Sequence, residues 1–172
     1  MKAMLVLGLL ASLVSGAAHA QLAKEDADEN GVLNPIDFSY RFYLDEMNRF
    51  PERIGIICGH AYEVHKTGRH DEALMFLKEC ARRGNPTSMV LIAEIYDSGG
   101  GDIKRDPEKA TQYVRQAAEL GWSSAQYLYG VALIEGHGIP KDAAAGEEWL
   151  KKAAAQGDKD ATALLATRAA IR

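Results

Sequence analysis

The sequence lacks the residue clusters that mark common catalytic, metal and nucleic-acid sites. It has only two cysteines and five histidines, and none of them stands in a C-x-x-C or H-E-x-x-H spacing, which argues against a zinc site. No Ser or Cys has a base nearby at a recognisable spacing, so no nucleophile is indicated. Lys and Arg are interspersed with Asp and Glu without a basic stripe, which excludes a nucleic-acid partner.

The first twenty residues have the pattern of a secretory signal. A basic Lys2 and an apolar run over residues 4–14 precede an A-x-A cleavage site that ends at Ala20. This predicts cleavage after Ala20 and a protein of the bacterial periplasm or the cell exterior. The run is shorter than the roughly 20 apolar residues that span a bilayer, although a retained membrane anchor is the alternative. No later apolar stretch approaches that length, and no Cys follows the site, which argues against a lipoprotein.

The rest of the chain contains an internal repeat. Glycines that follow Ala-rich segments are spaced 37 and 36 residues apart, and three other kinds of position recur in the same register. The four sets are Gly84, Gly121 and Gly157; the aromatics Phe76, Tyr113 and Trp149; the small residues Ala73, Ala110 and Gly146; and the turn glycines Gly68, Gly99 and Gly136. Four sets that recur together predict an array of similar units.

Each set has a physical role in a helical hairpin. Glycine just past a helix end adopts the left-handed conformation without a Cβ clash. A small residue lets two helices approach closely, and we expect the aromatic to fill the space between one hairpin and the next. Asp106 before Pro107 is typical of a helix start. Each unit is therefore predicted to be a helix, a Gly-rich turn and a second helix, which must stack on its neighbours.

At these residues the sequence resembles the Sel-like repeat family, relatives of the tetratricopeptide repeat. The unit at 125–157 follows the family pattern through Gly136-His137-Gly138-Ile139, Asp142, Trp149 and Lys152-Ala153-Ala154, and departs from it at Ala145-Gly146. The unit at 88–121 carries one extra turn glycine. The unit at 57–84 has a short turn, closer to the tetratricopeptide form.

The resemblance implies an all-α fold, a right-handed α/α superhelix of about three helical hairpins. These hairpins occupy residues 51–172, after a segment at 21–50 that includes an N-terminal helix. Residues 160–172 repeat the start of a first helix and are interpreted as the capping helix that such an array needs.

Cys58 and Cys80 both lie in the first unit. Cys58 is ten residues before Gly68 and Cys80 is ten residues after His70, so an antiparallel hairpin places them at the same height, where a disulfide is feasible. The resemblance also implies a disulfide, since such a bond joins the two helices of one unit in a cysteine-rich branch of the family. Two free core cysteines, or a metal or nucleophilic site, are the alternatives.

Residues 26–37 match the twelve-residue EF-hand loop, which binds Ca²⁺ through hard oxygen ligands. The predicted ligands are Asp26, Asp28, Asn30, the carbonyl of Val32, Asn34 and Asp37, with Gly31 at the sharp turn. Two features depart from the pattern: Asp37 stands where a bidentate Glu is usual, and no second loop is present to pair with this one. The alternative is a polar tail in which Asn34 caps the following helix.

The array predicts a concave groove lined by the first helix of each unit. Helical spacing assigns to it Glu63, Val90, Glu94, Tyr127 and Val131. This acidic and apolar mixture suits a basic, amphipathic segment of another envelope or secreted protein. The function predicted is therefore that of a scaffold that binds a protein and is not an enzyme.

Two further expectations concern the histidines and the possible chemistry. His60, His65 and His70 are five residues apart and are predicted to take solvated or helix-capping positions. The resemblance also implies a second class of function, because some cysteine-rich members of the family are described as binding or hydrolysing β-lactams. No residue of this sequence is indicated as the nucleophile of such a reaction.

Overall fold

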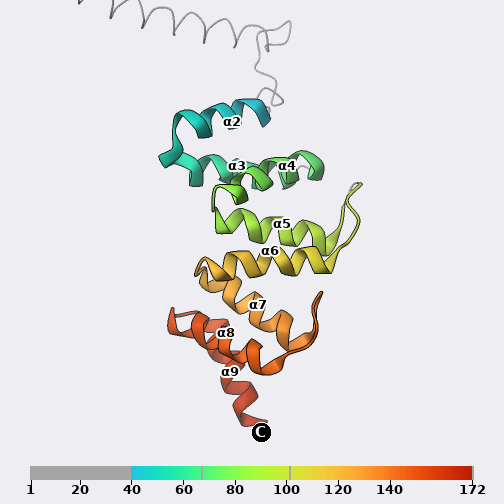
Figure 1. Cartoon of the computed structure of the whole chain (residues 1–172), viewed down its shortest axis with the longest axis vertical. Coiled ribbons are helices and arrows are strands. Elements are labelled where there is room, and N and C mark those ends of the chain that lie inside the picture. Colours follow the sequence, from blue (N-terminus) through green and yellow to red (C-terminus); the bar gives the residue numbers. More distant parts are fainter. Residues whose placement is uncertain (1–39, 67, 101, 172) are drawn as a thin grey trace, which may run out of the picture. The chain divides into compact units, whose positions relative to one another are not determined.

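A computed structural model describes residues 40–66, 68–100 and 102–171. Within them the chain forms eight α-helices and one short 3-10 helix (Figure 1). The bounds are α2 Tyr40–Arg49, η2 Pro51–Arg53, α3 Ile54–Lys66, α4 His70–Arg82, α5 Pro86–Ser98, α6 Pro107–Glu119, α7 Ser123–Glu135, α8 Ala143–Ala155 and α9 Lys159–Ala170. No helix in this part of the chain is long and apolar enough to cross a bilayer.

The predicted all-α solenoid is confirmed. The chain divides between Asp45 and Glu46 into two compact units, and the second unit holds the helices from α3 onward. In that unit each helix packs mainly on the next one along the chain, which gives the hairpins α3–α4, α5–α6 and α7–α8, followed by α9 on α8 (Figure 1). The predicted signal peptide and the EF-hand-like loop at 26–37 lie outside the described residues.

The helix ends follow the chemistry predicted for them. Gly84, Gly121 and Gly157 have φ values of +82°, +87° and +88°, the left-handed conformation in which glycine is favoured. The Asp106 carboxylate accepts a hydrogen bond from the Lys109 backbone N–H at 3.0 Å, so Asp106 is the N-cap of α6. Asn85, Asp142 and Asp158 cap α5, α8 and α9 in the same way.

The crossing of α7 and α8 explains why the third unit departs from the family pattern at Gly146. A Cβ added to Gly146 would lie 2.6 Å from the backbone oxygen of Gly130 and 2.7 Å from Cγ1 of Ile134. A Cβ added to Gly130 would in turn lie 2.9 Å from the Gly146 oxygen. The two glycines therefore allow a closer approach of the two helices than alanine would permit.

The recurring aromatic packs differently from our expectation in two of the three units. Tyr113 of α6 stacks on Tyr96 of α5, with ring centroids 6.1 Å apart. Trp149 of α8 meets Tyr129 of α7 edge to face at 5.4 Å. Each of these aromatics thus contacts the first helix of its own hairpin, because that helix supplies an aromatic partner at the matching height.

The first hairpin is joined covalently. Cys58 of α3 and Cys80 of α4 form a disulfide, with Cα atoms 6.0 Å apart, and both residues are buried. At the end of α4, the Arg83 guanidinium bonds the Glu79 carboxylate at 2.7 Å, the Asn48 side chain at 2.7 Å and the Met47 carbonyl at 3.3 Å. These bonds fasten the end of α2 to the first hairpin.

Candidate protein-binding groove

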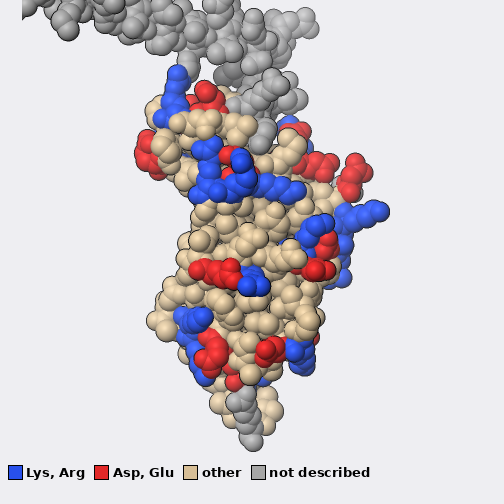
Figure 2. Space-filling model, viewed as in Figure 1, with Lys and Arg blue, Asp and Glu red and all other residues tan. Residues whose placement is uncertain are grey.

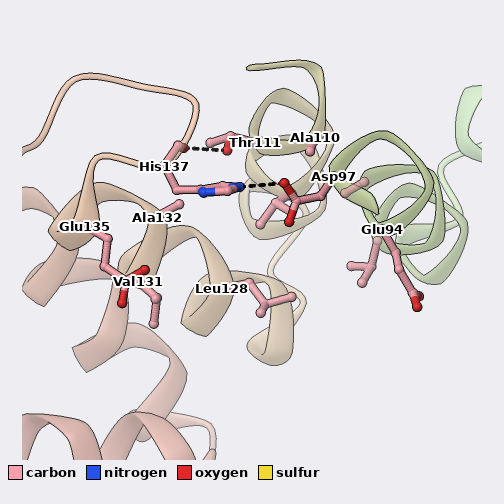
Figure 3. A pocket seen from close by; sticks show the side chains of 12 residues that line it. Glu94, Asp97, Ala110, Thr111, Leu128, Val131, Ala132, Glu135 and His137 are labelled. Atoms are coloured by element: carbon pink, nitrogen blue, oxygen red, sulfur yellow. Dashed lines mark hydrogen bonds and ion pairs between the residues drawn. The ribbon is translucent and has the colours of Figure 1, made fainter. Parts of the chain in front are cut away.

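A cavity of about 460 Å³ opens between α5, α6 and α7 (Figure 3). Its floor is made of small side chains, since Ala93, Ala110 and Ala132 are buried there without filling the space. The complete lining is Val90, Ala93, Glu94 and Asp97 from α5; Ala110, Thr111 and Val114 from α6; Leu128, Val131, Ala132 and Glu135 from α7; and His137 from the following loop. The small residues that let the helices approach therefore also leave a hollow above them.

The walls of the groove are apolar and partly open to solvent. Val90 of α5 faces Leu128 and Val131 of α7 across the cavity. Leu128 is 38% exposed, although it lines the hollow. The groove therefore offers apolar surface that another side chain could cover.

The rim of the groove is acidic. Glu94 and Glu135 are exposed and point away from the floor (Figure 3), and neither forms an ion pair with another described residue. No Lys or Arg is among the residues that line the cavity. On the face shown in Figure 2, by contrast, basic and acidic side chains lie close together in most places.

The third carboxylate of the rim has partners and a structural role. Asp97 accepts from Nε2 of His137 at 2.7 Å (Figure 3) and pairs with the Arg105 guanidinium at 3.3 Å. The buried Thr111 hydroxyl donates to the His137 carbonyl at 2.8 Å. These bonds hold the loop after α7 against α5 and α6, so that the wall of the groove is fixed at this end.

A second hollow, of about 510 Å³, lies between α3 and α5. Gly55, Gly59 and Tyr62 of α3 form one side, and Leu91 and Glu94 of α5 are on the other. Because Glu94 lines both hollows, the two are neighbours along the first helices of successive units.

The structure brings together three of the five residues that helical spacing assigned to the groove. Val90, Glu94 and Val131 line the main cavity. Tyr127 packs against the core around Leu150, as Val131 also does, but does not line the cavity, and the exposed Glu63 pairs with Lys66 at 3.4 Å.

Sequence reasoning missed Leu128, Asp97 and His137, which all line the cavity. Leu128 follows Tyr127 directly, and one residue of a helix rotates a side chain by about 100°. The sequence indicates only weakly which side of α7 faces the groove, because α7 is apolar on most of its faces.

Comparison with known proteins identifies the repeating unit. The family model of the Sel1 repeat matches residues 86–122 and 123–158, which are the two hairpins on either side of the groove. The chain contains two Sel1 repeats. Proteins built from Sel1 repeats are typically scaffolds for protein–protein interaction, and this family does not favour the alternative of a β-lactam hydrolase.

Solved structures support the same assignment. A Sel1 repeat protein from Oxalobacter formigenes is 33% identical with a TM-score of 0.56, over 60% of this chain and 42% of that one. Our chain thus corresponds to less than half of that protein. Cysteine-rich protein B of Helicobacter pylori has the same fold at 16% identity and a TM-score of 0.58, over 73% of this chain and 96% of that one.

Proposed function

We propose that the two Sel1 repeats hold a basic, amphipathic segment of another envelope or secreted protein in the groove between α5 and α7. The observation that carries this proposal is the combination of an open apolar cavity with two rim carboxylates, those of Glu94 and Glu135, that pair with no cation among the described residues. An apolar side chain of the segment would cover Leu128 and Val131. A Lys or Arg beside it would reach Glu94 or Glu135.

The two kinds of contact contribute differently. Full burial of a leucine-sized side chain stabilises a complex by about 1.5–3 kcal/mol, and the cavity is large enough to admit one. The carboxylates lie at the exposed rim, so they chiefly set the rate of association and the choice of partner. We therefore expect apolar contacts to dominate affinity and charge to dominate specificity.

A peptide panel tests this proposal by fluorescence anisotropy. One peptide is an amphipathic helix with Leu on one face and Lys on the other, and its counterpart carries Glu in place of Lys. We expect the basic peptide to bind and the acidic one not to bind. Replacement of Glu94 and Glu135 by Gln should weaken binding roughly three- to tenfold and reduce its salt dependence, and Leu128→Asp should abolish it.

The control is Glu148→Gln, which removes an exposed carboxylate of α8 that pairs with Lys151 and does not line the cavity. This variant should bind the basic peptide as the parent protein does. Equal affinity for the basic and acidic peptides, or full affinity in Leu128→Asp, would contradict a groove of this specificity.

We also propose that the segment 26–37 binds Ca²⁺, on the strength of the oxygen-bearing residues at its ligand positions. With Asp at the last position, the dissociation constant should fall in the weak extracellular range, about 0.1–1 mM. Isothermal titration should show binding that is lost when Asp26 and Asp28 are both replaced by Ala. Absence of heat at millimolar Ca²⁺ would instead indicate a polar tail.

An exported location fits both proposals. The disulfide between Cys58 and Cys80 is of a kind that persists in oxidising compartments such as the periplasm, and the predicted signal peptide would direct the chain there. A fusion of the first 20 residues to a reporter that is active only after export would test the location.

A further inference from the structure

Two histidines meet at the turn of the first hairpin, a contact that the sequence did not predict. His65 is in the last turn of α3 and His70 is the first residue of α4. Their Nδ1 atoms are 2.9 Å apart, and both side chains are partly buried. The short turn reverses the chain so quickly that residues five apart in sequence face one another.

The two rings do not meet head-on. Their centroids are 4.7 Å apart and their planes are tilted by 57°, so they are not stacked. Imidazoles joined by a straight N–H···N bond of this length would hold their centroids about 5.2 Å apart. Two imidazoles that converge at a right angle on one ion, with bonds of about 2.05 Å, bring them to about 4.5 Å. The observed separation fits the converging arrangement as well as a bent hydrogen bond.

The ring of His70 is held in place from behind. The backbone of Gly100, in the loop between α5 and α6, lies so close that an added Cβ would be 2.9 Å from Cδ2 and 3.1 Å from Nε2 of His70. His65 and His70 also belong to the hairpin that the Cys58–Cys80 disulfide closes. The Nδ1 atom of His70 is thus directed toward His65 by the fold.

We propose that His65 and His70 bind a divalent transition-metal ion, Cu(II) in preference to others, through their two Nδ1 atoms. With metal–nitrogen bonds of about 2.0–2.1 Å, nitrogens 2.9 Å apart subtend about 90° at the ion. That is the angle between neighbouring ligands in the square-planar or tetragonal geometry of Cu(II) and Ni(II). A tetrahedral Zn²⁺ site would need the nitrogens about 3.3 Å apart.

Ligand type and proton balance agree with this choice. Imidazole suits Cu(II), which binds most tightly among the divalent first-row ions. In the neutral pair one ring carries its proton on Nδ1 to make the hydrogen bond, and that proton must move to Nε2 when the ion binds. No third His, Cys, Asp or Glu in the described part of the chain completes a cluster, so water fills the other positions and the affinity should be moderate.

Nuclear magnetic resonance with substoichiometric Cu(II) chloride tests the site in the full chain. We expect paramagnetic broadening centred on His65, His70 and Gly100, unchanged by millimolar Ca²⁺. Competition with glycine as chelator should give a dissociation constant that rises at least tenfold in His65→Gln and in His70→Gln. Zn²⁺ should bind more weakly than Cu(II), as its geometry fits less well.

His60→Gln is the matched control, since it removes a histidine from the same helix and should leave the dissociation constant unchanged. Circular dichroism of each variant checks the fold, and His65→Gln suffices if His70→Gln is unstable. Broadening that is centred elsewhere, or that persists at full strength in His65→Gln, would overturn the proposal and leave the pair as a hydrogen bond between two imidazoles.

Discussion

The first hairpin and the last one reach the same architecture by different means. The pair α3–α4 has a short connection between Lys66 and His70 and a disulfide between its helices. The pair α7–α8 has a longer connection at residues 136–142 and no covalent link, but its helices touch through the backbones of Gly130 and Gly146. The first hairpin is thus held by a disulfide and the last one by close backbone packing.

The longer connection also joins one hairpin to another. A Cβ on Gly138 would lie 2.1 Å from the backbone oxygen of Pro107, so the loop after α7 rests directly on the start of α6. His137 in the same loop reaches Asp97 of α5. The connection between α3 and α4 is too short to reach a neighbouring hairpin in this way. In that unit the disulfide supplies the additional link.

The largest expected effect comes from breaking the close packing of the last hairpin. Gly146→Val should destabilise the protein by about 3 kcal/mol, because its side chain would overlap the backbone oxygen of Gly130 as well as the side chain of Ile134. Urea denaturation followed by circular dichroism measures this change. A loss below about 1 kcal/mol would show that the two helices can separate easily.

Gly59→Ala is the matched control in the first hairpin. Gly59 lies inside α3 and an added Cβ would meet nothing within 4 Å. Alanine there should stabilise the protein by about 0.5–1 kcal/mol, because it lowers the entropy of the unfolded chain and favours helix. Opposite signs for the two substitutions would confirm that glycine is required for packing in one hairpin only.

Much of this architecture was predictable from the sequence, because it depends on local rules. Glycine after a helix and Asp106 before Pro107 act within a few residues, and they recur with the repeat. The close contact between Gly130 and Gly146 was not predictable in the same way. It depends on how two helices cross, and a glycine inside a helix looks like a weak point when read alone.

Loss of the disulfide is expected to have an effect of similar size, confined to the first hairpin. Replacement of Cys58 and Cys80 by Ala should cost roughly 3 kcal/mol, since the disulfide closes a loop across a sequence separation of 22. In a linear array each unit contacts only its neighbours. Hydrogen exchange should therefore accelerate in α3 and α4 and remain slow in α7 and α8. Uniform acceleration along the chain would indicate that the array unfolds as one cooperative body.

The sequence predicts a groove along the first helices of the units, and the structure has a cavity there that α5 and α7 line together with α6. Val90, Glu94 and Val131 of the predicted residues lie in this cavity. Tyr127 was assigned to the groove because an amphipathic pattern is too weak in α7 to separate it from Leu128. The meeting of His65 and His70 was missed because it arises from the turn geometry and leaves no periodic signal.

The smallest effect concerns the helix caps, which differ between α4 of the first hairpin and α6 of the second. The N-cap of α4 is Arg69, which makes no side-chain cap bond, whereas Asp106 caps α6. The Lys109 side chain and its backbone N–H both bond the Asp106 carboxylate, and they lower its pKa. When the pKa of a carboxyl group is lower in the folded protein than in the unfolded chain, its ionisation stabilises the fold at pH values above the pKa of the unfolded chain. This contribution is lost as the pH falls through the pKa of the folded protein.

Asp106→Asn should therefore reduce stability slightly at pH 7 and less at acidic pH, where the parent carboxyl is itself protonated. Asparagine keeps an oxygen that can accept from the Lys109 backbone N–H, so the charge is the principal difference. The measurement is the urea midpoint of the parent and the variant between pH 7 and pH 2.5. The difference between the two urea midpoints should become smaller only at acidic pH, below the ordinary pKa range of an aspartate. A constant gap at all pH values would mean that the loss comes from geometry and not from the charge that distinguishes the cap of α6 from that of α4.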